Sequence, residues 1–286
     1  MAAKGFAWLF ARREGQLALP LAIFLHLFYV VPLAVLLASS FQQAAGMPGF
    51  SLGQYGEFFS DPVNLKVLRD TVWLGIQVTL GCLILGYPVA YVFVNAPAAW
   101  KGILTFLILL PLLTSAVVRT FGWVVILGKQ GLVNSFLQSL GLISEPIKLL
   151  FTHHGVAIAM TQIQLPLMIL PIAASLSQVD PRLAAASTSL GGGAWRTFWK
   201  IIFPLTLPGV VSGCLLVFAI TVSSFVTPSI IGGGQVMFMP TLIYQQAVVL
   251  LNGPFAAAVS AILLAVVLAV VVGLSALGQK SRAYMR

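Results

Sequence analysis

Charged residues are scarce in this chain. They make up 7% of its 286 residues and only six are acidic, whereas hydrophobic residues make up 59%. A soluble domain carries about 25% charged residues, so this chain has too few charges to cover a surface that faces water. The composition therefore excludes a soluble globular domain and predicts an all-α integral membrane protein. At about 20 residues for each span, the chain suffices for one bundle of roughly five to seven helices.

Cysteines, metal-ligand clusters and nucleotide-binding motifs are few or missing. Cys82 and Cys214 both lie in apolar runs, which predicts small buried hydrophobes rather than a disulfide or a metal site. His153 and His154 are adjacent, but no cluster of Cys, Asp or Glu accompanies them, so we expect no metal here. The pattern G-x-x-x-x-G-K-[ST] is absent. We therefore expect no ATP-binding site of that kind, and no cofactor, in this chain.

Long uncharged runs take up most of the sequence. Three runs lack Asp, Glu, Lys and Arg, a fourth contains only Arg119, and the uncharged interval 201–279 is divided by Gly and Pro residues. We therefore predict six spans, near residues 17–40, 71–95, 102–127, 154–177, 208–228 and 255–277. The first run is longer than the apolar region of a cleaved signal peptide, so we expect it to remain as a span.

The cations beside these spans predict the orientation. With the N-terminus inside, ten cations lie on the cytoplasmic side and four outside, a bias that favours both termini in the cytoplasm. The net charge of +9 then reflects these flanking cations and not nucleic-acid binding. The inner cations are Lys4, Arg12, Arg13, Lys101, Arg182, Arg196, Lys200, Lys280, Arg282 and Arg286, and the outer ones are Lys66, Arg69, Lys129 and Lys148.

The stretch 178–207, between the fourth and fifth spans, differs from the rest of the chain. Asp180 is a good N-cap and Pro181 suits the first helical position, which predicts a short helix up to Leu190. Three consecutive glycines, 191–193, break this helix, and a second helix is expected to begin near Ala194. The orientation places this stretch in the cytoplasm.

The second short helix is amphipathic. Apolar side chains recur on it at helical spacing, at Trp195, Phe198, Trp199 and Ile202. Arg196 and Lys200 stand four residues apart on another face, and Pro204 and Pro208 are expected to disrupt the continuation into the fifth span. Two interpretations stay open. The helix could lie on the lipid surface with its cations on phosphates, or the two helices and the glycine turn could form a rigid projection that fits a groove of a cytoplasmic partner.

The segment DPRLAAASTSLGGGAWRTFWKIIFPLTLPG, residues 180–209, resembles the cytoplasmic EAA loop of permease subunits in binding-protein-dependent ABC importers. That loop reads roughly Glu-Ala-Ala, three residues, Gly, about nine residues, Ile, one residue, Leu-Pro. Alignment on Gly191 places Ala185, Ala186 and Ser187 at the Glu-Ala-Ala positions. The resemblance covers nearly the whole chain, and PLLTSAVVRTFGWVVILG (111–128) and SSFVTPSIIGGG (223–234) are similar to the spermidine/putrescine branch.

The resemblance implies a six-helix type I importer permease in a bacterial inner membrane. It implies a cytoplasmic dimer of ATP-binding subunits that holds ATP and Mg, a second homologous permease and a periplasmic binding protein that delivers a polyamine. The family's glutamate is replaced by Ala185. Contact with the ATP-binding subunit is then expected to involve Arg182, Ala185, Ala186, Ser187, Gly191, Trp195, Arg196, Phe198 and Lys200.

Several polar residues are candidates for the substrate pathway. Arg119 could line this pathway or an outer gate, or it could reach outward and pair with a loop carboxylate or carbonyls. The other candidates are Tyr91, Gln162, Gln164, Thr221, Ser223, Ser224 and Phe225. The alternative for the patch that begins at Thr221 is ordinary helix packing through small and hydroxyl side chains.

The identity of the solute stays open. No acidic residue lies inside a predicted span, and Ser224 occupies a place where the spermidine branch often has an acid, which weakens a polyamine assignment. Amino-acid derivatives, opines and aminophosphonates are alternatives. So is an autonomous secondary transporter or channel or a membrane enzyme, although a coupled carrier usually buries an acid in a span.

Overall fold

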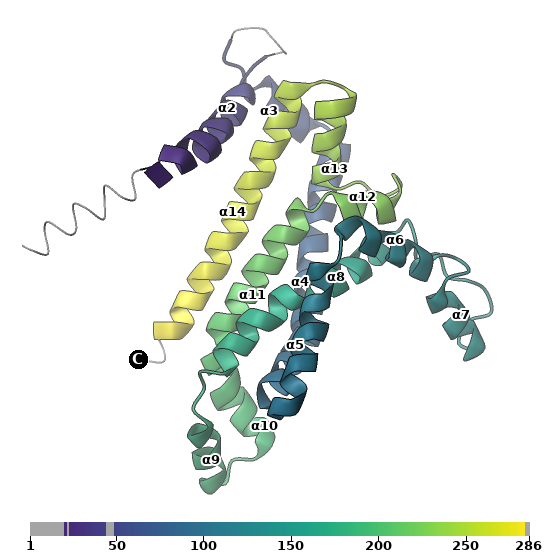
Figure 1. Ribbon diagram of the computed structural model, residues 1–286. Coiled ribbons are helices and arrows are strands. Elements are labelled where there is room, and N and C mark those ends of the chain that lie inside the picture. The colour runs from purple at the N-terminus through teal and green to yellow at the C-terminus, as the bar shows by residue number, and fades with distance from the viewer. Residues whose placement is uncertain (1–19, 22, 44–48, 284–286) are drawn as a thin grey trace, which may run out of the picture. The chain divides into compact units, whose positions relative to one another are not determined.

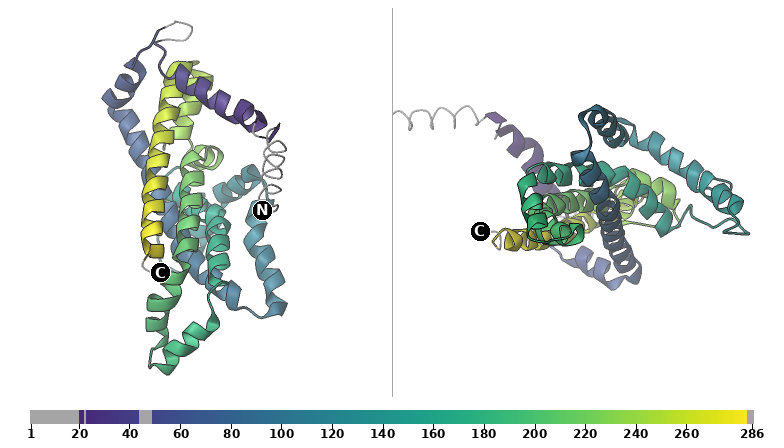
Figure 2. Two further views of the ribbon diagram at one scale, coloured as in Figure 1. Left: turned by 90° about the vertical axis from the view of Figure 1, so that its left-hand side faces the viewer. Right: turned by 90° about the horizontal axis from the view of Figure 1, so that it is seen from below.

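A computed structural model describes residues 20, 21, 23–43 and 49–283, with side chains described up to residue 276. Every regular element in these ranges is a helix (Figure 1, Figure 2). The prediction of an all-α protein is therefore confirmed. The inner cations Lys4, Arg12, Arg13 and Arg286 lie outside the described residues, as do residues 17–19 and 22 of the first predicted span.

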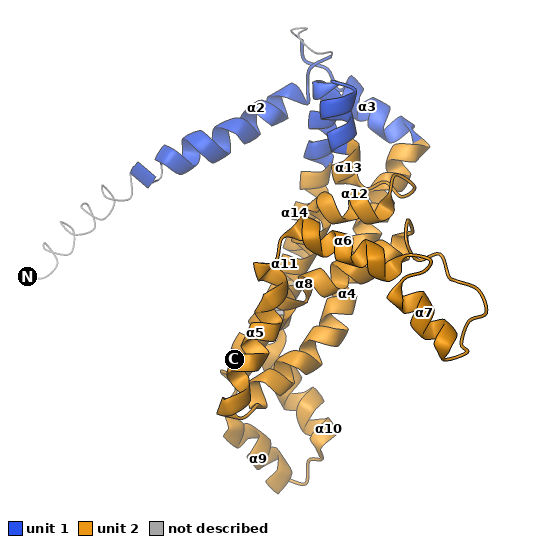
Figure 3. Ribbon diagram, turned by 45° about the vertical axis from the view of Figure 1, so that its right-hand side comes forward, with its two compact units in different colours: residues 1–61, 243–262 blue, residues 62–242, 263–286 orange. Residues whose placement is uncertain are grey.

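The chain divides into two compact units, residues 1–61 with 243–262 and residues 62–242 with 263–286 (Figure 3). The first unit contains η1 (His26–Val30), α2 (Val31–Ser39), α3 (Gly53–Ser60) and η3 (Gln245–Val249). The loop after α2 folds against α3, because the Ser40 and Tyr55 hydroxyls share a hydrogen bond of 2.7 Å and the ring of Phe41 stacks on that of Phe50.

The second unit contains most of the helices. They are α4 (Pro62–Asn95), α5 (Ala98–Leu113), α6 (Ala116–Leu127), α7 (Leu132–Ser139), α8 (His153–Leu176), α9 (Pro181–Ser189), α10 (Ala194–Thr197), η2 (Phe198–Ile202), α11 (Phe203–Ser223) and α12 (Val226–Gly232). Two helices, α13 (Met239–Tyr244) and α14 (Gly253–Ala283), cross the boundary between the units. The centre of the second unit is formed by α4, α8 and α11, which lie side by side (Figure 1).

The three central helices approach one another at glycines. A Cβ atom at Gly209 of α11 would lie 2.5 Å from the carbonyl oxygen of Pro171 in α8, and one at Gly213 would lie 3.3 Å from the Cα of Met168. Gly209 and Gly213 are four residues apart and therefore on the same face of α11. Gly75 of α4 meets the side chain of Val222 in the same way. Membrane helices associate through such small-residue contacts because burial from lipid provides no hydrophobic driving force.

Five of the described helical segments are long and apolar enough to cross a membrane. They are Pro62–Asn95, Ala116–Ser139, His153–Leu176, Ala194–Ser223 and Gly253–Ala276, and the apolar helices Ile23–Ser39 and Ala98–Leu113 are shorter. The predicted span 102–127 is two helices, since Thr114 and Ser115 are extended between α5 and α6. Pro111 lacks the N–H that would continue the ladder of α5, which weakens the helix just before this break.

The predicted span 208–228 also differs from the structure. It is interrupted at Ser224, whose backbone is extended, and the next helix ends at Gly232, where the capping residue Gly233 has a positive φ of 53°. At its other end the helix does not stop at the prolines as expected. It continues from Ala194 through the π-helical turn η2 into α11, with Pro204 in the first turn of α11. In this π-helical turn the Phe203 N–H bonds to the carbonyl of Phe198, five residues earlier, just before Pro204, which has no N–H to donate.

We predict that Gly209→Ala separates α8 from α11 and lowers the free energy of unfolding by roughly 1–3 kcal/mol, as overpacking does. Chemical unfolding in detergent micelles, followed by tryptophan fluorescence, measures this change. Gly102→Ala in α5 is the control, because nothing lies within 4 Å of a Cβ atom there. Equal loss in both variants would contradict the close contact between α8 and α11.

Candidate functional site

The connection between α8 and α11 forms a helical hairpin, residues 180–202, which we call the coupling hairpin. Its first helix begins as predicted, because the carboxylate of Asp180 accepts a hydrogen bond of 2.9 Å from the backbone N–H of Arg182, and Pro181 follows the cap. Gly191 has a positive φ of 77°, a conformation that favours glycine. This glycine reverses the chain between α9 and α10, which lie beyond the ends of α8 and α11 (Figure 1).

Most of the coupling hairpin is exposed. No residue of α9 is buried, and Leu190 and Trp195 at the turn are 88% and 75% exposed. Large exposed apolar side chains on a rigid projection are typical of a contact surface. Seven of the nine residues predicted for partner contact are exposed, namely Arg182, Ala185, Ala186, Gly191, Trp195, Arg196 and Lys200, whereas Ser187 and Phe198 are half-buried.

Aromatic rings connect the coupling hairpin to the central helices. The ring of Phe198 meets that of Tyr87 in α4 edge-on at 5.5 Å, and the ring of Trp199 lies 5.0 Å from that of Phe203 in α11. The hydroxyl of Tyr87 also shares a buried hydrogen bond of 2.9 Å with Thr206 of α11. Phe198, on the predicted apolar face of the second helix, therefore packs against α4, whereas Trp199 and Phe203 are one turn apart on the same continuous helix.

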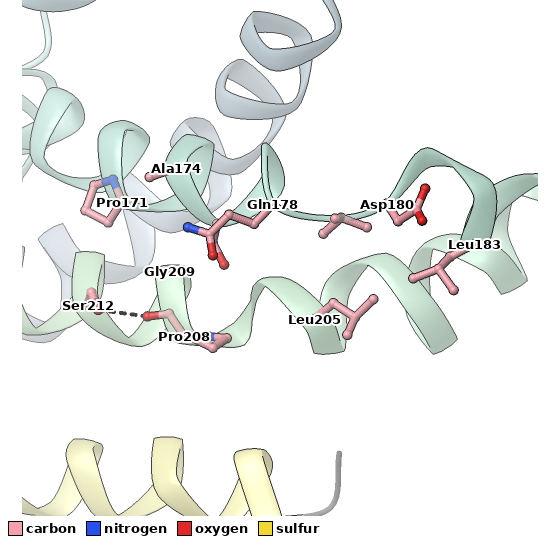
Figure 4. A pocket seen from close by; sticks show the side chains of 11 residues that line it. Pro171, Ala174, Gln178, Asp180, Leu183, Leu205, Pro208, Gly209 and Ser212 are labelled. Atoms are coloured by element: carbon pink, nitrogen blue, oxygen red, sulfur yellow. Dashed lines mark hydrogen bonds between the residues drawn. The ribbon is translucent and has the colours of Figure 1, made fainter. Parts of the chain in front are cut away.

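A pocket of about 670 Å³ lies at the base of the coupling hairpin (Figure 4). Figure 4 shows the end of α8 on one side of it and α11 on the other, with Gln178 and Asp180 as its most polar side chains. Its lining residues are Pro171, Ala174, Ser175, Gln178, Val179, Asp180, Leu183, Leu205, Pro208, Gly209 and Ser212. The pocket borders the beginning of α9, so this end of α9 faces open space and not a packed helix.

Arg119 lies at the break between α5 and α6. Its guanidinium donates a hydrogen bond to the carbonyl oxygen of Pro111, in the last turn of α5, and its backbone N–H bonds to Ser115. A cation near a helix C-terminus is favourable because unpaired carbonyls gather there. This contact is of the kind expected for pairing with carbonyls, and it ties the two halves of the broken helix together.

The second halves of the two broken helices, α6 and α12, pack against each other. The side chains of Thr120 in α6 and Thr227 in α12 share a buried hydrogen bond of 2.9 Å. At the second break the Ser224 hydroxyl donates to the carbonyl of Ile220 and its backbone N–H donates to Thr221. Irregular backbone at membrane depth is tolerated only inside protein or beside a water-filled cavity. The two breaks therefore mark a polar zone in the second unit.

The structure brings together only part of the predicted pathway set. Gln162 of α8 accepts a hydrogen bond of 3.1 Å from Trp123 of α6, whereas Gln164 is buried in the core. Thr221 is buried at the end of α11, where Ser223, Ser224 and Phe225 follow it.

Tyr91 was predicted to border the same pathway as this group, and it lies toward the other end of α11 from Thr221. It lies one turn beyond Tyr87, which bonds to Thr206 at the hairpin end of α11. Thr206 and Thr221 are 15 residues apart, roughly 22 Å along a helix. Sequence alone does not give the register between α4 and α11 that separates Tyr91 from the patch.

Sequence reasoning missed the threonine pair that joins α6 to α12 and the Tyr87–Thr206 bond. The sequence around a hydroxyl residue in an apolar run does not indicate which residue its hydroxyl will bond to. The close contact of Gly209 and Gly213 did have a signal, since small residues four apart mark helix–helix contacts in membranes. In the part of the chain that the structure describes, no group of three or more His, Cys, Asp or Glu side chains could hold a metal.

Comparison with known proteins gives one family. The sequence model of the family described as binding-protein-dependent transport system inner membrane component matches residues 5–280 of this chain. The spermidine/putrescine transport system permease protein PotB of Haemophilus influenzae is 32% identical over 237 residues, 82% of each chain. The protein of the same name from Escherichia coli is 34% identical over 225 residues, 79% of this chain and 80% of that one.

Solved structures show the same fold. A bacterial alginate ABC transporter, in complex with an alginate pentasaccharide-bound periplasmic protein, contains a chain that matches with a TM-score of 0.79 and 16% identity. The match covers 96% of this chain and 97% of that chain.

A further relative by sequence is a putative 2-aminoethylphosphonate transport system permease protein, PhnU of Salmonella typhimurium. It is 27% identical over 237 residues, 81% of this chain and 80% of that one.

We predict that Thr120→Val lowers the free energy of unfolding by roughly 1–3 kcal/mol, because a buried hydroxyl loses its partner. Thr120 already donates to the carbonyl of Ala116 at 2.7 Å, so Thr227 must donate to Thr120 and would be left without an acceptor. Unfolding in detergent micelles measures the change. The double variant Thr120→Val, Thr227→Val should recover part of the loss. The control is Thr105→Val, whose exposed hydroxyl bonds only within its own helix.

Proposed function

This chain belongs to the family of inner membrane components of binding-protein-dependent transport systems, and we propose that it is one permease subunit of an ATP-driven polyamine importer. The proposal places both termini and the coupling hairpin in the cytoplasm. It places the break between α11 and α12 toward the periplasm, at the other end of α11.

The observation that carries the proposal is the coupling hairpin. In the family that the sequence resembles, the corresponding loop docks on the ATP-binding subunit. Here the hairpin presents Leu190 and Trp195 at an exposed turn, while Phe198 packs against Tyr87 of α4 and α10 continues as one helix into α11. A rigid base and an apolar tip fit a helix-in-groove contact with a cytoplasmic partner. ATP and Mg are then held by that partner, which closes on ATP and moves the hairpin.

Two further partners belong to the proposal. A second homologous permease subunit would complete the pathway between the two membrane components, and a periplasmic binding protein would deliver the solute at the outer side. The alginate transporter in complex with a periplasmic protein has a chain of the same fold, which supports such an assembly. On the permease side, Arg119, Gln162, Thr221, Ser223, Ser224 and Phe225 are proposed to border the pathway near the two helix breaks.

The proposed substrate class is a polyamine, because PotB proteins of that branch are 32–35% identical over about four fifths of this chain. An anionic or zwitterionic solute such as an aminophosphonate is the second candidate. It is favoured by Arg119 at the first break and by the lack of Asp and Glu in the described part of the chain between residues 71 and 144 and between 146 and 179. A polycation would meet few carboxylates on this route.

Uptake measurements separate the two substrates. Cells that carry the native transport system, and cells lacking only this chain, are given radiolabelled spermidine with putrescine or 2-aminoethylphosphonate as competitor. We expect uptake of spermidine that requires this chain, needs ATP and is competed by putrescine. Uptake that only 2-aminoethylphosphonate inhibits would favour an aminophosphonate over a polyamine as the substrate. Spermidine uptake that is unchanged in cells lacking this chain would overturn the proposal.

We predict that Leu190→Asp and Trp195→Asp each release the ATP-binding subunit. A buried apolar anchor contributes at least about 2 kcal/mol to an interface, so each change should weaken retention roughly 30-fold. Copurification in mild detergent measures the retained ATP-binding subunit. Leu142→Asp is the matched control, because Leu142 is an equally large exposed apolar residue (67%) in the loop after α7, far along the chain from the hairpin. Full retention by both hairpin variants would contradict the docking role.

A further inference from the structure

The hydroxyl of Ser187 behaves differently from those of its two neighbours in α9. Thr188 and Ser189 donate to the carbonyls four residues earlier, so their hydroxyls serve their own helix. Ser187 instead shares a hydrogen bond of 2.7 Å with the hydroxyl of Thr197 in α10. This bond therefore crosses the coupling hairpin and joins its two helices through side chains.

The surroundings of this bond are closely packed, although the rest of α9 is open. Thr197 is buried, and a Cβ atom at Gly192 would lie 2.5 Å from the Ser187 hydroxyl and 2.9 Å from its carbonyl oxygen. The Gly192 N–H also donates to that carbonyl at 2.8 Å. The turn thus folds tightly over Ser187 and leaves little room for other arrangements of its side chain.

The position of the bond is important because α9 has little else to hold it. None of its residues is buried, and its first turn borders the pocket at the base of the hairpin. By contrast, α10 continues without interruption through η2 into α11. A force applied to α9 reaches α10 through the glycine turn, which is conformationally free, or across the hairpin, where Ser187 is bonded to Thr197 and α9 also contacts η2.

We propose that Ser187 and Thr197 are positioning residues that make α9 and α10 move as one body, so that closure of the ATP-binding subunits is passed to α11. This inference rests on the proposed function. It assigns a role to the serine that stands where the family's loop has its second alanine. The two residues act through the hairpin and contact neither ATP nor the transported solute.

Thr197→Val removes the hydroxyl with little change in shape, and Thr197→Ser retains it. The transporter, purified with its ATP-binding subunits and reconstituted in proteoliposomes, is assayed for solute imported per ATP hydrolysed. We expect Thr197→Val and Ser187→Ala to lower this ratio roughly three- to tenfold, the range for loss of one hydrogen bond, while the ATP-binding subunits stay bound. Thr197→Ser and the control Ser189→Ala should keep the wild-type ratio.

A disulfide between positions 187 and 197 tests whether a connection between α9 and α10 is sufficient for coupling. The hydroxyls are 2.7 Å apart, so Ser187→Cys and Thr197→Cys together place two thiols within bonding reach. Diamide accepts the two electrons and two protons released as the S–S bond forms, and dithiothreitol reverses the step. We expect a low coupling ratio in the reduced double variant and a wild-type ratio after oxidation, with no effect of either reagent on the wild-type protein.

The outcomes separate this inference from the function on which it rests. A wild-type complex without ATP-binding subunits would overturn the proposed function. A wild-type complex that couples normally, with an unchanged ratio in Thr197→Val and Ser187→Ala, would overturn only the positioning role. Loss of ATP-binding subunits from the variants would also overturn it, since the pair would then serve docking and not transmission.

Discussion

The structure of the second unit depends on the contact between the backbones of α8 and α11. At Gly209 and Gly213 no side chain of α11 separates the two helices, and the backbone of α8 at Pro171 and Met168 fills the space that a Cβ atom would need. Helices in lipid gain little from apolar burial, so short-range packing of this kind is what holds them in register. The coupling hairpin joins the ends of these same two helices. Its place relative to the bundle is therefore set by a contact within the bundle, and the Tyr87–Thr206 bond adds α4 to the same rigid group.

This rigid group has a continuous helix as its longest member. From Ala194 to Ser223 the chain forms 30 helical residues, roughly 45 Å, without a break. At one end the helix carries half of the coupling hairpin, and at the other it stops at Ser224, where the chain turns into α12. The bond between Thr120 and Thr227 then connects α12 to α6, which follows the other break. Under the proposed function, a displacement of the hairpin would thus be conveyed by one stiff element to the point where both broken helices meet. Breaks concentrated at that end leave the backbone free to change there while the hairpin end keeps its packing.

Sequence was sufficient for features that depend on neighbouring residues and insufficient for those that depend on register. The cap at Asp180, the helix from Pro181 and the glycine turn follow from local rules, and the structure has all three. The break at Thr114 and Ser115 was not predicted, because a hydropathy pattern does not distinguish a short extended segment from the apolar helix around it. Pro111, just before the break, was the one local indication. The separation of Tyr91 from Thr221 could not be predicted for a related reason, since only packing shows which turns of two helices are neighbours. The bond from Ser187 to Thr197 has no sequence signal either.

The replacement of the family's glutamate by Ala185 changes the charge balance of the coupling hairpin. Asp180 is the one acidic residue between residues 146 and 283, and its carboxylate already caps α9. The other charged residues of the coupling hairpin, Arg182, Arg196 and Lys200, are exposed and positive, so the hairpin carries three cations and one anion. Electrostatic complementarity governs specificity and association rate more than affinity, so under the proposed function we expect acidic groups at the rim of the groove that receives this hairpin. A cation placed to meet the usual glutamate would face Ala185 and repel the hairpin. Under the proposed function, the charge of the hairpin would then contribute to the choice of partner, and the apolar turn would provide the strength of the contact.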